Sequence, residues 1–353
     1  MLQQEDLDAA VAKGILTEAQ ATGLREFALQ REKERIAILG HEERFRFMRG
    51  FNDFFFAVGV ILLTAGLAFF AGSSTIGNLV GAAVIWALAE LLVRRMRLVL
   101  PGILLASFFV VFVFHVGFWA APPMLDFPTN AIDGFLYGAF GGVSPLAKVA
   151  KSLIATLAAL GFYVRFRLPF ALMLVAAGLV LTVVAAVGPS LTPWLFSMLL
   201  LVCGLGVFAA AMFYDLSDPE RTTRRADCAF WLHLLAAPLI VHSLVSAAAP
   251  TMVTINAVSA VTIIAIVALL AVVAVVIDRR ALFVSALSYL GIVIAYAIRT
   301  AGISAGEFVL FTTLLILGVL VLTLGVGWLP LRRPLMTLIP AGLARRLPPV
   351  VPA

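Results

Sequence analysis

The sequence predicts an all-α protein: a polytopic transmembrane bundle of about ten spans, preceded by a short cytosolic helical hairpin. Hydrophobic residues make up 63% of the chain and charged residues 12%, against about 45–50% and 25% in a soluble domain. Beyond residue 53, the apolar runs suffice for about ten crossings of a bilayer core, each needing about 20 residues. The runs are continuous, as in Phe54–Ala71, which excludes a barrel of alternating strands.

Residues 1–40 are expected to form the cytosolic hairpin. Gly14 is placed to end a first short helix. Thr17 and Gln20 have the spacing of a capping box at the start of a second. A DNA-binding helix-turn-helix is the alternative, but four glutamates on the second helix would repel phosphate, so no nucleic acid partner is expected. The hairpin is expected to pack on itself or on a protein partner.

The next residues, 41–53, mix arginine with phenylalanine before the first span. Such a segment is typical of the membrane interface, where it contacts anionic lipid. The transmembrane domain is then expected over residues 54–331, followed by a basic, proline-rich cytosolic tail over residues 332–353. The predicted spans are 54–71, 76–93, 98–120, 148–164, 168–187, 191–213, 227–248, 254–277, 281–298 and 307–329. The long 121–147 loop is either interfacial or re-entrant.

The distribution of basic residues predicts the orientation. If both ends lie inside, all but three of the 25 lysines and arginines fall on the cytoplasmic side. The exceptions are Lys148, Lys151 and Arg299. Because cytoplasmic loops carry the excess of basic residues, a multi-pass protein of the bacterial cytoplasmic membrane with both termini inside is expected. Its partner is the lipid bilayer, while the composition does not predict an oligomeric state.

No cofactor, metal site or catalytic residue is expected. The sequence lacks a Gly-rich phosphate loop, a His-Glu-x-x-His pair and a Gly-x-Ser-x-Gly elbow. Cys203 and Cys228 lie in or at the end of apolar runs, where neither a disulfide framework nor a metal site is expected. No carboxylate lies near the middle of a span, which argues against an ion-driven carrier. Glu90 precedes Arg94 by four residues, an order that favours a helix ion pair.

The histidines are candidate functional residues within the spans. His115 and His242 are predicted to lie at similar depths near the outer ends of their spans, and His233 near an inner end. His233 and His242 are nine positions apart, about 900° of helical rotation, so they face opposite ways. Each could serve a function or could bond to a neighbouring helix, which is the commoner role of a polar side chain in a span.

The loop 214–227 is the inside connection with the most acidic residues. Its candidate functional residues are Asp218, Arg221 and Asp227. Their charges could pair with one another, or the loop could be a docking surface for the N-terminal hairpin, since both are cytoplasmic and both mix charge signs.

Two stretches carry a family resemblance. The first is the module Gly14-Ile-Leu-Thr-Glu-Ala-Gln20. The second runs from Asp218-Pro-Glu-Arg through Asp227 and Phe230-Trp-Leu-His233 to His242. Together with the polytopic core they resemble a bacterial family of predicted integral membrane proteins of unknown function. The resemblance implies a bacterial inner-membrane protein and brings no activity, substrate or site residue.

Three classes of function are consistent with these patterns. A non-enzymatic protein that senses, scaffolds or assists at the membrane is favoured by the cytosolic hairpin and the lack of charge in mid-span. A transporter or permease for a small or lipidic molecule is the alternative, with His115, His242 and Tyr296 as expected lining residues. A membrane enzyme would need clustered ionisable residues at one face, for which only the stretch 214–233 is a candidate.

Overall fold

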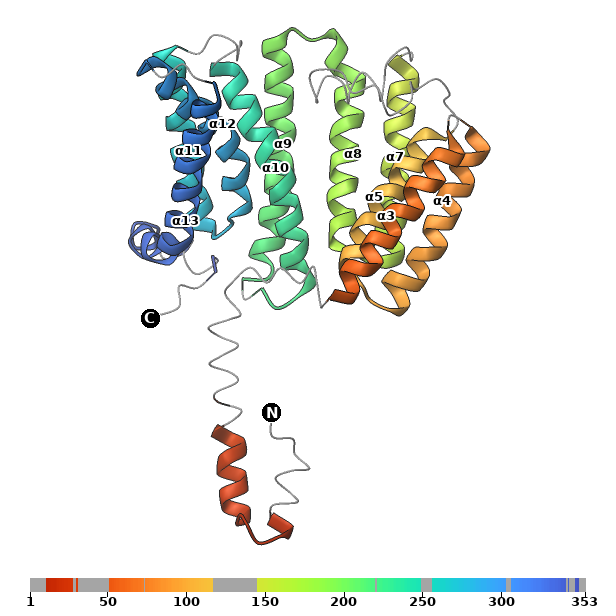
Figure 1. Cartoon of the computed structure of the whole chain (residues 1–353), viewed down its shortest axis with the longest axis vertical. Helices are drawn as coiled ribbons and strands as arrows, with labels where there is room; N and C mark the ends of the chain where they lie inside the picture. The colour runs from red at the N-terminus through yellow and green to blue at the C-terminus, as the bar shows by residue number, and fades with distance from the viewer. Residues whose placement is uncertain are drawn as a thin grey trace.

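The structure is a computed structural model, and it describes residues 11–27, 30, 51–72, 74–116, 145–219, 221–248, 256–302, 306–340, 342 and 347–348. Every regular element among these residues is helical (Figure 1), so the all-α fold class is confirmed. The continuous apolar runs explain this result, because a segment in lipid must satisfy its backbone hydrogen bonds internally.

From residue 51 onward, the described residues contain ten α-helices. They are α3 (Phe51–Ala71), α4 (Thr75–Ala89), α5 (Val99–His115), α7 (Pro145–Phe166), α8 (Pro169–Val187), α9 (Pro193–Leu216), α10 (Arg224–Ala248), α11 (Ala257–Ile277), α12 (Ala281–Thr300) and α13 (Gly306–Thr337). A π-helical turn, η1 (Glu90–Arg95), continues α4, and a 3₁₀ turn, η2 (Gly188–Ser190), follows α8.

Eight of these helices are long and apolar enough to cross a membrane. The shorter apolar segments are Val99–His115, which is α5, and Ala286–Thr300 within α12. Each of the ten predicted spans overlaps one helix. The structure is therefore compatible with a multi-pass integral membrane protein, with eight crossings supported by helix length and composition.

Several helix ends differ from the predicted boundaries. The span predicted to reach residue 120 ends as a helix at His115, because Val116 adopts an extended conformation. Helix α13 continues to Thr337 and so runs into the predicted tail, even though it contains Pro330 and Pro334. The segment 41–50, predicted to be interfacial, and most of the 121–147 loop, predicted to be interfacial or re-entrant, lie outside the described residues.

The capping box near the N-terminus is confirmed. The Thr17 amide donates to Oε1 of Gln20 at 3.0 Å, and the Gln20 amide donates to Oγ1 of Thr17 at 3.3 Å. Gly14 has a φ of 69°, the left-handed conformation expected of a residue that ends a helix. The complete hairpin is not shown, since most of its first helix lies outside the described residues.

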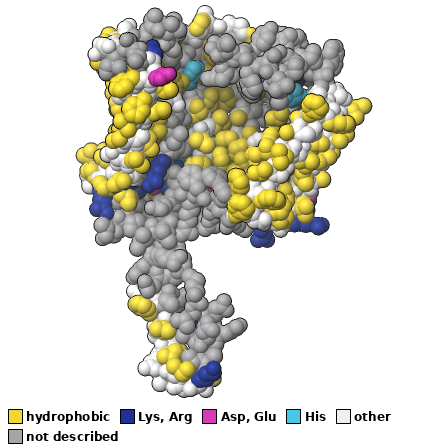
Figure 2. All heavy atoms as spheres, viewed as in Figure 1, with side chains coloured by type: hydrophobic (Ala, Val, Ile, Leu, Met, Phe, Trp, Pro, Cys, Tyr) yellow, Lys and Arg dark blue, Asp and Glu magenta, His cyan; other side chains and the backbone are white. Residues whose placement is uncertain are grey.

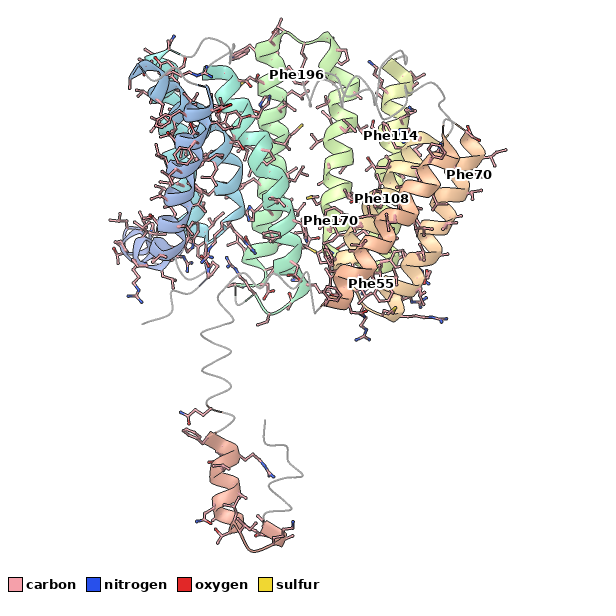
Figure 3. The ribbon with its side chains drawn as sticks, viewed as in Figure 1. Phe55, Phe70, Phe108, Phe114, Phe170 and Phe196 are labelled. Carbon is pink, nitrogen blue, oxygen red and sulfur yellow. The ribbon has the colours of Figure 1, made fainter. Side chains whose placement is uncertain are left out.

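The helices form two bundles joined along α8, α9 and α10 (Figure 1). The N-terminal bundle, α3–α8, packs around one buried cluster, and the C-terminal bundle, α9–α13, packs largely around a second. At the junction the Phe170 ring of α8, labelled in Figure 3, meets the Trp231 ring of α10 with centroids 4.8 Å apart. Figure 2 shows apolar side chains over much of the visible surface of both bundles, as lipid contact requires.

The hairpin turns at one end of the bundles share a backbone feature. Arg97, Arg167 and Asp278 each adopt a positive φ, at 57°, 50° and 59°. Each lies between two helices in an arginine-containing turn: α4 and α5, α7 and α8, or α11 and α12. The left-handed residue reverses the chain at the end of a helix, which lets the next helix begin within a few residues. We call this the basic end of the molecule.

Candidate functional site

The candidate site is a buried group of ionisable side chains at the basic end of the C-terminal bundle. Four helices and the turns between them bring these residues together. We define the ionic cluster as Asp215, Arg221, His233, Asp278, Arg279 and Arg332.

Asp215 is the centre of the first half of the cluster. It lies in the last turn of α9, and His233 of α10 places Nε2 2.8 Å from its Oδ2. Arg279 lies in the α11–α12 turn and donates Nε to Oδ2 at 3.1 Å and Nη2 to Oδ1. Its Nη2 also donates to the carbonyl of Ala226 at 3.2 Å. Both oxygens of Asp215 are therefore occupied by donors from two other elements.

Asp278 is the centre of the second half. It caps α11 in the left-handed conformation. Trp328 of α13 donates its indole Nε1–H to Oδ1 at 2.7 Å, and Arg221 donates Nη1 to Oδ2 at 3.0 Å. Arg332 of α13 places Nη1 3.8 Å from the same Oδ2 and donates Nη2 to the carbonyl of Pro348 at 2.6 Å. The second half therefore ties the α9–α10 loop, the α11–α12 turn, α13 and the tail together.

The cluster holds three arginines against two carboxylates, and backbone carbonyls offset the difference. Arg221 donates Nη2 to the carbonyls of Ile277 and Asp278 at 3.2 and 2.8 Å. These groups form the C-terminus of α11, which carries partial negative charge from the helix dipole. Arg279 and Arg332 are only 2% and 1% exposed. Charges buried this deeply persist only when hydrogen bonds replace their hydration.

His233 is completely buried, and its ring also meets the Phe208 ring with centroids 5.2 Å apart. Since Nε2 lies against a carboxylate oxygen, Nε2 carries the hydrogen. Within the described residues, Nδ1 of His233 is buried without a hydrogen-bonding partner. A buried N–H without an acceptor is costly, so this geometry favours the neutral ring with a free Nδ1 lone pair.

Asp218 lies beside the cluster and orders the loop before α10. Its Oδ2 accepts from the amide and hydroxyl of Thr223 at 2.9 and 2.7 Å, and its Oδ1 accepts from the amide of Thr222 at 3.2 Å. Burial alone would raise the pKa of the Asp218 carboxyl, but the hydrogen bonds from Thr223 and Thr222 outweigh burial and lower the pKa below its ordinary value. Asp218 is thus a loop-ordering carboxylate.

The other predicted site residues are placed apart from the cluster. Asp227 lies exposed in the first turn of α10. Its negative charge is stabilised there by the positive N-terminal end of the helix dipole. His115 ends α5 and places Nδ1 2.8 Å from the Val111 carbonyl. His242 places Nδ1 2.7 Å from the Tyr289 hydroxyl of α12, with Ser246 Oγ 3.5 Å from Nε2. The structure therefore brings together Arg221 and His233, and it joins neither His115 nor His242 to them.

Sequence reasoning missed five residues of the site: Asp215, Asp278, Arg279, Trp328 and Arg332. Arg279 and Arg332 were assigned only to the orientation signal. One pattern could have identified the site: Asp278 is an acidic residue at the very end of an apolar run, directly followed by two arginines. An acidic residue at the end of a span needs a buried partner or a role in ending the helix. Asp278 has both, because it caps α11 and bonds to Arg221 and Trp328.

The N-terminal bundle carries a smaller charged group at the same end. Glu90 accepts from Arg94 at 3.3 Å, which confirms the predicted helix ion pair. It also accepts from Arg165 of α7, from Nε at 2.8 Å and from Nη2 at 3.0 Å. These side chains are 31–58% exposed, in contrast to the buried cluster.

The arrangement of the ionic cluster is better suited to holding helix ends together than to catalysis by a carboxylate. All four oxygens of Asp215 and Asp278 face donors from other elements, so each carboxylate links its helix to its neighbours. In the described part of the chain, no three His, Cys, Asp or Glu side chains gather as a metal site would need. No protein-family model, curated protein or solved structure in the comparisons matches the chain.

Proposed function

We propose that the protein is a non-enzymatic component of the bacterial cytoplasmic membrane that senses, scaffolds or assists, with ten spans and both termini in the cytoplasm. The distribution of arginine supports this orientation, because the ionic cluster, the Glu90 group and the arginine turns all lie at one end. The two shorter helices, α5 and α12, are counted as spans because each packs between longer ones. The family resemblance of the opening module and of residues 218–242 is part of this proposal.

The observation that carries the proposal is that donors from other elements face every oxygen of both buried carboxylates. The cluster connects α9, α10, the α11–α12 turn and α13, and so it sets how their cytoplasmic ends lie together. Hydrogen bonds reach every oxygen of both carboxylates, but Nδ1 of His233 has no hydrogen-bonding partner among the described residues, so the network is only partly satisfied. We propose that this network can close and open, which is the kind of two-state element that a sensing or scaffold protein needs.

The N-terminal hairpin is the proposed signalling contact. Its second helix exposes Leu24 and Phe27, and the α9–α10 loop exposes Thr222. Arg221, in the same loop, bonds to Asp278, so a contact with this loop would be linked to the closed cluster. The hairpin could act on this loop directly or present its apolar face to a protein partner.

The test pairs a cysteine at Leu24 with one at Thr222 in the full chain, with Cys203 and Cys228 replaced by alanine. Mild oxidation in membranes is expected to join the pair, and the further change Asp278→Asn is expected to reduce the yield. A pair at Leu24 and Arg299, at the opposite end of the bundle, is the control. No cross-link at position 222, or a yield unchanged by Asp278→Asn, would contradict the proposed contact.

The orientation has its own test. A reporter that is active only in the cytoplasm, fused after Ala353, is expected to be active. A reporter fused in the α8–α9 turn at Ser190 is expected to be inactive there. Activity at Ser190 and inactivity after Ala353 would overturn the orientation, while activity at both sites would overturn the span count.

Transport of a small molecule is the second candidate function, favoured by His242, Tyr289 and Ser246. These polar side chains lie together between α10 and α12, within otherwise apolar segments. Polar groups within a span often mark a substrate path. A cysteine at Ser246 should then react with membrane-impermeant reagents added from either side in turn. Reaction from neither side would remove this candidate.

A further inference from the structure

We propose that the N-terminal bundle binds one anionic phospholipid at the basic end, with its phosphate beside Arg94 and Arg95 and one acyl chain in a groove along α7. The proposal rests on the chain lying in a bilayer and is independent of which activity the protein has. Two cavities on either side of the Glu90–Arg165 ion pair carry it.

The first cavity is polar and open. Its volume is about 600 Å³, and its lining residues are Ala87, Glu90, Leu91, Arg94 and Arg95. It lies along the π-helical turn η1, whose extra residue per turn alters the direction of the side chains there. Such π-helical turns occur frequently at functional sites. Arg94 and Arg95 are both exposed at this cavity.

The second cavity is a shallow apolar groove that is widely open to its surroundings. Its volume is about 580 Å³, and its lining residues are Trp86, Leu157, Leu160, Gly161, Val164 and Arg165. A side-chain carbon added at Gly161 would meet no atom within 4 Å, so this glycine leaves open space. The Trp86 ring is held by the rings of Phe109, Phe162 and Phe166, with centroids 5.1–6.0 Å away. The groove therefore has a fixed aromatic wall.

The dimensions suit an acyl chain. Leu157 and Arg165 are eight residues apart on α7, a rise of about 12 Å. One leaflet of the hydrocarbon core is about 15 Å deep, half of the roughly 30 Å of the full core. The groove starts at an arginine and runs about 12 Å along a span. This length matches most of the depth of one leaflet, so the groove can hold an acyl chain whose headgroup lies at the arginine.

The charge of this region selects an anionic headgroup. The ends of η1 and α7 and the turns that follow them carry five exposed arginines, Arg94, Arg95, Arg97, Arg165 and Arg167, and Glu90 is the acid that pairs with two of them. The formal excess is four positive charges. Glu90 is engaged by Arg165 through two hydrogen bonds and by Arg94 through one, so its charge is neutralised. Figure 2 shows Lys and Arg side chains at the lower edge of this bundle.

The Trp86 side chain provides the measurement, because it lines the groove. The full-length protein is reconstituted in phosphatidylcholine vesicles that contain phosphatidylglycerol or phosphatidylcholine with brominated acyl chains, which quench tryptophan on contact. The quenching of Trp86 is obtained as the difference between the wild type and Trp86→Phe. The ratio of the two lipids' binding constants measures the preference for the anionic lipid, and a ratio above one is expected.

Two variants and a control test the assignment. The double variant Arg94→Gln with Arg95→Gln should lower the preference by about fivefold for each arginine removed. Gly161→Leu retains every arginine and fills the groove, so it should reduce quenching by both lipids. Arg299→Gln removes an exposed arginine at the opposite end of α12 and should leave the preference unchanged. Size-exclusion profiles check that each variant is folded.

Three results would overturn the proposal. The first is an unchanged preference in the double arginine variant. The second is an equal loss of preference in Arg299→Gln, which would indicate unspecific attraction of the whole protein. The third is loss of the preference on adding inorganic phosphate at millimolar concentration, which would show a phosphate site without a lipid.

Discussion

The N-terminal and C-terminal bundles both place charged side chains at the basic end, but they bury them to very different extents. In the N-terminal bundle, Glu90 and Arg165 form a bidentate pair in which each side chain is about a third exposed. In the C-terminal bundle, Asp215 and Arg279 form a pair that is almost completely buried. The same two chemical groups therefore meet in two different dielectric environments.

The difference shows what each bundle relies on. The N-terminal bundle has an aromatic core in which Phe162 and Phe166 meet with centroids 4.4 Å apart, and its charges remain available to lipid. In the C-terminal bundle the charges themselves connect the helices. A buried pair costs desolvation and adds directional bonds, so it specifies which helix ends meet more than it adds net stability.

The largest expected effect comes from Asp215→Asn. The substitution keeps the size of the side chain but leaves Arg279 as a buried charge without a carboxylate, which costs about 3–5 kcal/mol. The free energy of unfolding in mixed micelles measures this loss. A loss below about 1 kcal/mol would show that water reaches the pair and that the contrast between the bundles is wrong.

An intermediate effect is expected from Asp218→Ala. Removing a carboxylate that accepts two backbone amides in the loop directly before α10 is expected to cost about 1 kcal/mol, as loss of a helix cap does. The loss should depend on pH. Since the folded-state pKa lies below the ordinary value of 3.8, the carboxylate contributes its full stability above that pH and loses it as the pH falls through the folded-state pKa.

The measurement for Asp218 is therefore the difference in unfolding free energy between wild type and Asp218→Ala as a function of pH. The difference should be constant near neutral pH and should shrink under acid conditions. A difference that grows as the pH falls would have the wrong sign and would contradict the loop-ordering role of Asp218.

The smallest effect is expected from Glu90→Gln, the matched change in the N-terminal bundle. Exposed ion pairs contribute about 0.2–1 kcal/mol, and salt weakens them. The loss should therefore be several times smaller than for Asp215→Asn under the same conditions, and it should decrease further at high ionic strength. Equal losses at positions 90 and 215 would remove the distinction between the bundles.

These contrasts also show how far the sequence could predict the structure. The helical fold follows from the apolar runs, and the Glu90–Arg94 pair follows from a spacing of four along one helix. Arg165 lies 75 residues from Glu90, and Trp328 lies 50 residues from Asp278. These pairs depend on which helices are neighbours. Since the spans are apolar on every side, their periodicity gives no orientation and cannot predict those neighbours.

The histidines illustrate the same limit. The opposite facing of His233 and His242 was predictable from helical rotation, and the two do contact different helices, α9 and α12. That His233 meets Asp215 was not predictable. His233 was predicted near the inner end of its span, but many residues share that depth, and only the packing of α9 on α10 selects Asp215 as its partner.

The tail contact at Pro348 has a consequence for biosynthesis. A chain enters the membrane from its N-terminus, and domains generally fold in that order. The N-terminal bundle is complete once residue 187 has been synthesised, whereas the ionic cluster needs Trp328 and Arg332 of α13, and Arg332 in turn bonds to Pro348. The ionic cluster therefore closes only after residue 348 has been synthesised. Until α13 has been synthesised, Asp278 lacks two of its partners, Trp328 and Arg332.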